Sequence, residues 1–163
     1  MKTKQKIITP DLLAFLRMEF RLPWNGTHGV SHWARVRFNG LRLAALNNAN
    51  STVVELFAFM HDLRRRNDHF DPLHGPRAAS LAEELNGRYF TISMEEQELL
   101  SIACHGHTRE RTHDDVTVRT CWDADRLDLG RVGIRPRAKY LCTPEARNND
   151  VIEEAYTRSR RYR

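Results

Sequence analysis

The hydrophobic positions of the chain recur with the three-to-four-residue spacing of helices, and no segment shows the strict alternation of a strand. The first helical series follows Thr9 and Pro10, a capping residue and a proline at the first helical position. A second series begins near Ser31 and stops in the segment NNAN, and a third begins with Ser51 as its cap. These series predict three helices in the N-terminal part of the chain.

The later part of the chain predicts four more helices. Ser93 and Glu96 match a capping box, in which each side chain bonds the other residue's backbone at a helix start. The four helices are expected at residues 76–85, from Ser93 to a break at Gly106, from Thr112 or Asp115 to Gly130, and from Thr143 onward. The pattern therefore predicts an all-α fold, a compact helical bundle.

Length and composition fit one globular domain over residues 1–163, with 40% hydrophobic and 29% charged residues. No run of about 18 apolar residues occurs, so no membrane span is expected. The start MKTKQKIITP has no apolar stretch after it and does not predict a signal peptide. The chain has three cysteines and no CxxC motif, which favours buried, reduced thiols and a cytoplasmic location.

The net charge of +5 raises the possibility of an anionic partner. The arginines are scattered, and the terminal RSRRYR is interpreted as a solvated tail. A basic balance suits a small phosphate ester as well as it suits nucleic acid, so charge alone does not choose between them.

Histidines and aspartates recur at the ends of the expected helices. His61 and Asp62 stand side by side at the end of an apolar helix, and adjacent helical residues diverge by about 100° around the axis. A helix end would let both approach a metal, or let the carboxylate reach a second one. The full set of candidates on these helices is His32, His61, Asp62, His74, His105, Asp123 and Asp125.

Imidazole and carboxylate ligands without thiolate suit Mn²⁺, Fe²⁺, Co²⁺, Ni²⁺ or Mg²⁺, and they do not exclude zinc. Only one of Asp123 and Asp125 can face a common centre, because the two lie about 200° apart on a helix. Asp125 shares its face with Cys121, Trp122 and Leu129, an apolar stripe, and is therefore preferred to Asp123.

The order H…HD…H…H…D resembles the HD-domain metal-dependent phosphohydrolase superfamily over roughly residues 28–130. HWARV is similar to that family's first-histidine segment, FAFMHDLRR to its HD segment and ADRLD to its closing aspartate segment. HGPRAA and IACHGH are similar to insertions found in branches that hold two metals. The N- and C-terminal helices would then pack on this core.

The resemblance implies a set of ligands. His32, His61, Asp62 and Asp125 would bind a first metal, and His74 and His105 would bind a second with Asp62 as the bridging, catalytic carboxylate. His107 is disfavoured relative to His105, since it lies beyond the expected helix end. One or two divalent ions would be the cofactor.

Arginines beside the motifs are candidates for contacts with a phosphorylated substrate, because guanidinium groups match phosphate oxygens. Arg65 and Arg109 are preferred among them. Arg65 also replaces the glutamate that nucleotidase-like members carry three positions after the HD aspartate, so their substrates do not transfer directly. The glycine-tyrosine-proline signature of the cyclic-dinucleotide branch does not occur.

Three functions compete for this sequence. The preferred one is a metal-dependent phosphohydrolase that acts on a small phosphate ester of the nucleotide kind. A di-iron oxygenase is the alternative, because a branch of the same superfamily uses a six-ligand set for oxygen chemistry. A nucleic-acid-binding module without catalysis ranks last, since no interleaved aromatic and basic patch is found.

Overall fold

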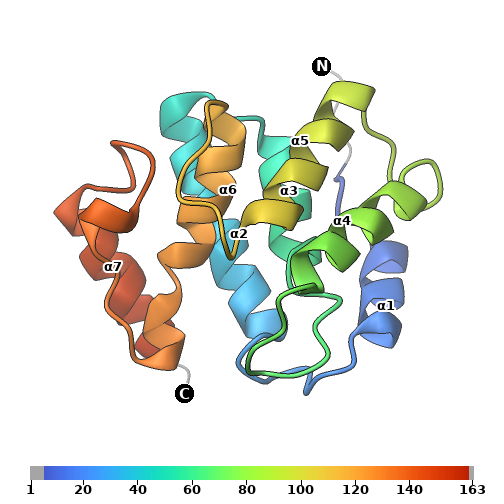
Figure 1. Ribbon diagram of the computed structural model, residues 1–163, viewed down its shortest axis with the longest axis horizontal. Coiled ribbons are helices and arrows are strands. Elements are labelled where there is room, and N and C mark those ends of the chain that lie inside the picture. Colours follow the sequence, from blue (N-terminus) through green and yellow to red (C-terminus); the bar gives the residue numbers. More distant parts are fainter. Residues whose placement is uncertain (1–5, 162–163) are drawn as a thin grey trace.

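The chain folds into helices joined by short loops, as seen in a computed structural model that describes residues 6–161 (Figure 1). Within these residues the one β-type contact is an isolated bridge between Asn86 and Phe90. The elements are α1 (Pro10–Glu19), α2 (Val30–Asn47), α3 (Ser51–Met60), α4 (His74–Leu85), α5 (Met94–Gly106), α6 (Val116–Arg126), the short 3₁₀ helices η1 (Leu129–Val132) and η2 (Ala138–Tyr140), and α7 (Asn149–Arg160). The all-α expectation is confirmed.

Helices α2, α3 and α6 form the centre, and α4 and α5 pack together beside them (Figure 1). Gly40 allows the close approach in the centre, because a Cβ there would lie 2.5 Å from Val54 Cγ1. Gly75 does the same between α4 and α5, where a Cβ would lie 2.5 Å from the Cys104 carbonyl oxygen. These contacts bring the ends of five helices toward one region.

Two groups of buried side chains hold the helices together. The larger includes Trp33, Phe57 and Trp122, and the Trp122 indole donates a hydrogen bond of 2.9 Å to the Ala103 carbonyl. The smaller includes Leu43, from α2, and packs α7 against η1 and α2. Burial of this apolar surface is the main stabilising contribution expected for such a core.

Several expected helix boundaries need correction. Asn50, rather than Ser51, caps α3, because its side chain accepts from the amides of two following residues. The helix α4 already starts at His74 rather than Pro76. The capping box at Ser93 is confirmed.

The C-terminal half shows two further differences. Asp115, rather than Thr112, caps α6, which ends at Arg126 before the separate helix η1. The residues from Thr143 form a turn, and α7 starts only after its cap Asn148.

The expected solvated tail is part of α7 as far as Arg160. Ser159 is buried, and Arg158 donates a hydrogen bond of 3.0 Å to Asn39 and lies over the Phe38 ring. The solvated-tail interpretation is therefore wrong for Arg158 and Ser159, whereas Arg160 is exposed. Residues 162–163, like the first five residues, lie outside the described chain.

The three cysteines Cys104, Cys121 and Cys142 are free thiols and buried, as expected. Burial raises the pKa of Cys121 and Cys142 above the ordinary value, so these groups remain thiols rather than reactive thiolates. Among residues 6–161, no helix has the length and apolar character needed to cross a membrane.

Candidate metal centre

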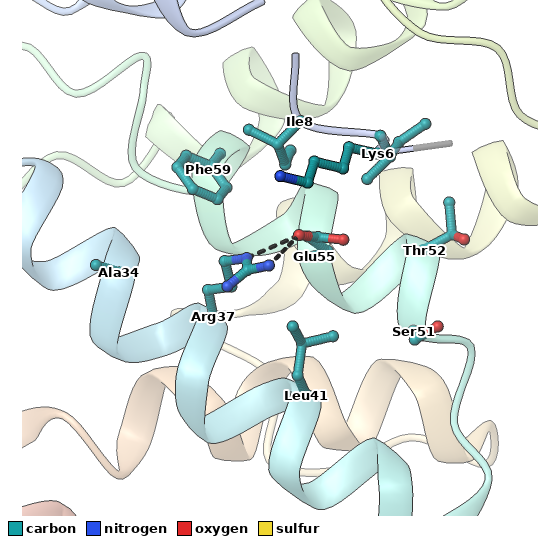
Figure 2. A pocket seen from close by; sticks show the side chains of 10 residues that line it. Lys6, Ile8, Ala34, Arg37, Leu41, Ser51, Thr52, Glu55 and Phe59 are labelled. Carbon is teal, nitrogen blue, oxygen red and sulfur yellow. Dashed lines mark hydrogen bonds and ion pairs between the residues drawn. The ribbon is translucent and has the colours of Figure 1, made fainter. Parts of the chain in front are cut away.

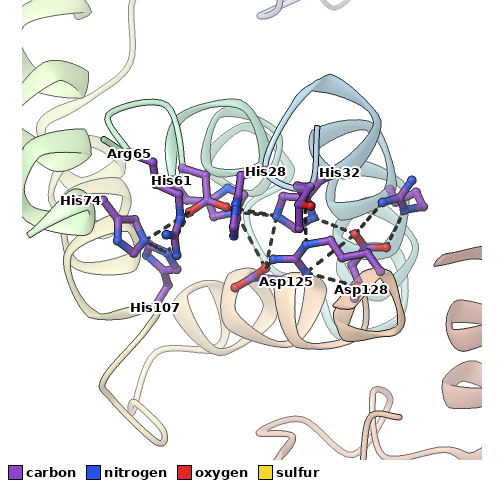
Figure 3. A network of polar contacts seen from close by, with 12 residues as sticks. His28, His32, His61, Arg65, His74, His107, Asp125 and Asp128 are labelled. Atoms are coloured by element: carbon purple, nitrogen blue, oxygen red, sulfur yellow. Dashed lines mark hydrogen bonds and ion pairs between the residues drawn. The ribbon is translucent and has the colours of Figure 1, made fainter. Parts of the chain in front are cut away.

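Helix ends bring four histidines and two aspartates into one buried cluster (Figure 3). The members are His32 in the first turn of α2, His61 at the C-cap of α3, Asp62 directly after it, His74 as the first residue of α4, His107 at the C-cap of α5, and Asp125 at the end of α6. End positions free these side chains from the helix surface and let them point toward a shared space.

The first half of the cluster contains four ligand-type atoms around one point. His32 Nε2 lies 3.1 Å from His61 Nε2 and 3.4 Å from Asp62 Oδ2. Asp125 Oδ1 lies 3.4 Å from His32 Nε2 and 3.8 Å from His61 Nε2. These four residues are the ones that the resemblance assigned to a first metal.

The second half uses the other oxygen of the same aspartate. His74 Nε2 lies 2.9 Å from His107 Nε2 and 3.2 Å from Asp62 Oδ1, and His107 Nε2 lies 3.7 Å from that oxygen. Asp62 therefore stands between two groups of imidazoles, with one oxygen facing each.

Each of the four imidazoles has its second nitrogen engaged outside the cluster. His32 Nδ1 lies 2.7 Å from Asp128, whose carboxylate also accepts two hydrogen bonds from Arg35. The other three face backbone carbonyl oxygens: His61 Nδ1 at Phe57, His74 Nδ1 at Asp71 and His107 Nδ1 at Cys104, at 3.1, 2.5 and 2.7 Å. Carbonyl and carboxylate oxygens only accept, so every Nδ1 carries the hydrogen.

This tautomer leaves the Nε2 atoms of neutral rings as bare lone pairs, and they face each other at 3.1 and 2.9 Å. Two lone pairs at that distance repel unless a cation lies between them. Asp125 Oδ1 also needs a positively charged partner, because it is buried and accepts no hydrogen bond among the described residues. The donor set thus requires positive charge in both halves of the cluster.

The charge balance supports the same requirement. Burial lowers the pKa of His61, but the carboxylates of Asp62 and Asp125 outweigh it and raise the pKa above its ordinary value. Burial also works against ionised Asp62 and Asp125, yet His61 holds the pKa of Asp62 well below its usual range and that of Asp125 at about 2. A proton on His61 would therefore stabilise the two carboxylate charges, and a divalent cation would stabilise them more strongly.

Ligand spacing fits a metal of ordinary size. An ion bound at about 2.1 Å places its ligand atoms about 3.0 Å apart at right angles and about 3.4 Å apart in a tetrahedron. The separations of 2.9–3.8 Å within the two halves surround these values. Both halves fit a divalent metal, and carboxylate and imidazole ligands without thiolate favour the ions named above.

His105 does not lie in the cluster, and its place is taken by His107. The helix α5 ends at Gly106 as expected, but its C-cap His107 keeps a helical backbone conformation. The missing Cβ of Gly106 makes room for Trp122, whose Cζ2 would lie 2.8 Å from such a Cβ. Two residues along a helix turn by about 200°, so His105 faces solvent while His107 is buried. We therefore replace His105 by His107 in the candidate ligand set.

Asp125 faces the cluster and Asp123 does not, although Asp123 is the more deeply buried of the two. Asp123 accepts hydrogen bonds from the amides of Cys142 and Thr143 at 2.6 and 2.7 Å and from the Thr143 hydroxyl at 2.8 Å. It joins α6 to the C-terminal segment. The preference for Asp125 over Asp123 agrees with this geometry, and the residues that cover Asp123 lie about twenty positions later in the sequence.

The two candidate substrate arginines differ in position. Arg65 Nε donates a hydrogen bond of 2.9 Å to Asp62 Oδ1, and its Nη1 donates to the carbonyls of Asn67 and His69, so it fixes the Asp62 carboxylate and the loop that follows. Arg109 is exposed and lies outside the cluster.

Sequence reasoning missed residues that surround the centre. Asp128, three positions after Asp125, orients His32 (Figure 3). Arg131 donates to the Thr27 and Asp128 carbonyls, and its Nη2 lies 3.8 Å from Asp125 Oδ1. His28, in the turn before α2, is buried with Nδ1 2.7 Å from Asp68.

A cavity of about 520 Å³ lies elsewhere, between α2, α3 and the segment before α1 (Figure 2). An Arg37–Glu55 ion pair crosses it, with aliphatic side chains and Phe59 around the pair. Its described lining residues include no histidine, so the imidazole chemistry lies apart from this cavity.

No family model and no curated protein matches the chain. A crystal structure described as a predicted HD superfamily hydrolase, from an uncultured Thermotogales bacterium, is similar to it with a TM-score of 0.69 and 24% sequence identity. The match covers 90% of this chain and 84% of that one. The chain therefore has the fold of an HD superfamily hydrolase, and the fold implied by the resemblance is confirmed.

Proposed function

We propose that the chain is a divalent-metal-dependent phosphohydrolase that acts on a small phosphate ester of the nucleotide kind. The observation that carries the proposal is the pair of imidazole groups whose bare Nε2 atoms face each other on either side of Asp62. Hydrolysis also agrees with the name of the similar structure, a predicted hydrolase.

The residues that would hold two ions follow from the two halves of the cluster. His32, His61, Asp62 and Asp125 would hold one, and Asp62, His74 and His107 the other. Bound divalent ions would supply an activated water and neutralise phosphoryl charge.

The surrounding residues prepare this chemistry. Arg35 and Asp128 fix the ring of His32, a second layer of contacts that usually governs metal affinity. Arg131 is held by two backbone carbonyls, with Nη2 facing the Asp125 side of the centre, where it would neutralise a phosphate oxygen. Arg65 keeps Asp62 in its bridging orientation.

The test is phosphate release from a panel of nucleotides and simple phosphate esters, with Mn²⁺, Mg²⁺, Co²⁺, Ni²⁺ or Fe²⁺ added. We expect turnover of at least one member that a chelator abolishes and that His61→Ala lowers by a factor of about 10² or more. The matched control is His69→Ala, because His69 is exposed and its ring lies outside the cluster.

Absence of turnover across the panel would reject the phosphohydrolase. If the iron-loaded protein then consumed oxygen, the same ligand set would be assigned to the di-iron oxygenase instead.

A further inference from the structure

A second cavity, of about 400 Å³, has five cationic residues among the eleven that line it. Its walls come from the loop after α5, the end of α6 and the segment from Lys139 to Arg147. These five cationic residues share the lining with a single carboxylate, that of Glu110. The cations are Arg109, Arg111, Arg126, Lys139 and Arg147.

Two of these cations, Arg126 and Arg147, donate hydrogen bonds to the backbone of the cavity walls and are not free to bind a ligand. Arg126 donates to the carbonyl oxygens of Glu110, Arg111 and Tyr140, and it lies over the Trp122 ring. Arg147 Nε donates 2.9 Å to the Leu141 carbonyl. The two walls are therefore fixed relative to each other before any ligand arrives.

Other cations in the wall have no anionic partner. Arg109 and Arg111 are exposed, and their side chains make no hydrogen bond or ion pair with the described part of the chain. The Lys139 ammonium lies 4.8 Å from the Tyr140 ring centroid and pairs with no carboxylate among residues 6–161. Unpaired cations crowded around one hollow repel one another, and a multivalent anion would relieve that repulsion.

The cavity adjoins the metal centre through Thr108. This residue lines the cavity, and its hydroxyl oxygen lies 3.4 Å from His74 Nε2. A phosphate chain with one phosphoryl group at the centre could therefore continue past Thr108 into the basic cavity.

Cys142 also lines the cavity, but it does not act as a nucleophile there. Its thiol donates to the Arg111 carbonyl and accepts from Arg126, and burial raises its pKa. The chemistry of this hollow is therefore anion binding.

We propose that this basic cavity binds the phosphate groups next to the scissile phosphoryl group, so that the substrate carries a chain of two or more phosphates. The proposal deepens the proposed phosphohydrolase function and rests on it for the reaction. Water would form the new bond to phosphorus at the centre, and the bond to the neighbouring bridging oxygen would break. The departing phosphate in the cavity would keep that bond's electron pair, and the proton lost by water would balance it.

The first experiment measures binding without catalysis, so that it stands even if no hydrolysis is found. Tripolyphosphate and orthophosphate are titrated by calorimetry into full-length protein freed of metal on a chelating resin. We expect tripolyphosphate to bind at least tenfold more tightly than orthophosphate, and Arg109→Ala/Arg111→Ala to weaken its binding at least tenfold.

Arg88→Ala is the matched control, because Arg88 is exposed and lies before the start of α5, at the opposite end of that helix from the cavity. We expect this variant to bind tripolyphosphate as tightly as the wild type does. Equal tripolyphosphate affinity in the double variant and the wild type would overturn the proposal, as would equal affinity for the two anions. Arg126 is left unchanged because its substitution would release the cavity walls.

The second experiment uses metal-loaded protein with a nucleoside triphosphate and p-nitrophenyl phosphate as probes. The double variant should lower the ratio of their kcat/KM values at least tenfold, mainly through KM of the triphosphate. An unchanged ratio would overturn the proposal. Hydrolysis of neither probe would count against the phosphohydrolase, whereas the calorimetry would still decide whether the cavity binds polyphosphate.

Discussion

At the scale of single residues, the centre is defined by which imidazole nitrogen carries hydrogen. Oxygen acceptors engage Nδ1 of all four histidines, and the Nε2 atoms are therefore available as metal ligands. The Nδ1 hydrogen bond fixes the orientation of each ring, and Nε2 remains available to bind a metal ion.

His107→Ala should lower the metal content of the protein from about two ions to one per chain, because the second half of the cluster loses one of its two imidazoles. His105→Ala, two positions earlier and exposed, should leave the content unchanged. Elemental analysis of both variants, purified without chelator, makes the comparison. A loss of metal in His105→Ala with full content in His107→Ala would return His105 to the ligand set.

The two aspartates of α6 should separate binding from stability. Asp125→Ala removes a ligand and should abolish metal-dependent activity, with a small change in melting temperature. Asp123→Ala removes three hydrogen bonds to the C-terminal segment and should lower the free energy of unfolding by about 3 kcal/mol.

Activity assays and thermal melts of both purified aspartate variants test this separation. A stable Asp123→Ala protein without bound metal would show that the roles are reversed.

At the scale of elements, the centre depends on how closely α4 and α5 approach. His74 begins α4 and His107 follows α5, so the distance between these helices sets the second half of the cluster. Gly75 permits the contact, because a Cβ at that position would meet the Cys104 and His105 carbonyl oxygens at 2.5 and 3.0 Å.

Gly75→Ala should push the two helices apart and cost about 1–3 kcal/mol of stability. It should also remove the second ion while sparing the first, whose four candidate ligands, including the shared Asp62, all lie outside α4 and α5. Glu84→Ala, on the exposed side of α4, is the control. Metal titration followed by calorimetry checks the result, and two unchanged binding events in Gly75→Ala would contradict it.

Sequence patterns predicted the helices well where the signals were local. The capping box at Ser93 and the Thr9–Pro10 start needed only neighbouring residues, and both were confirmed. The end of α5 at Gly106 was also predicted correctly. The exclusion of His107 was wrong, because the residue directly after the helix end keeps a helical backbone conformation and is buried by residues distant in sequence, which local spacing cannot reveal.

The same limit explains what was missed around the site. Asp128 is the last residue of ADRLD and Arg131 lies three positions after it, but their roles come from contacts with His32 and Thr27, about a hundred positions earlier. His61, Asp62 and Asp125 could be proposed because order and spacing alone carry the resemblance. The site is thus predictable in its motifs and unpredictable in its supporting contacts.

At the scale of the whole molecule, five helix ends meet around one buried cluster, and Asp62 lies between its two halves. Asp62 follows α3, the most apolar helix, whose residues from Leu56 to Met60 are all buried. The hydrophobic core therefore holds Asp62, the proposed bridging ligand, in a fixed place, and the basic cavity adjoins the cluster through Thr108. This arrangement answers why an apolar helix should end in a histidine and an aspartate.

Anomalous X-ray diffraction from crystals of the protein loaded with Mn²⁺ tests directly whether Asp62 joins two metal sites. We expect two manganese peaks about 3.5–4 Å apart, one between His32 and His61 and one between His74 and His107, with Asp62 contacting both. A Mn²⁺-loaded crystal with no peak at Asp62, or with manganese bound only elsewhere on the chain, would contradict it.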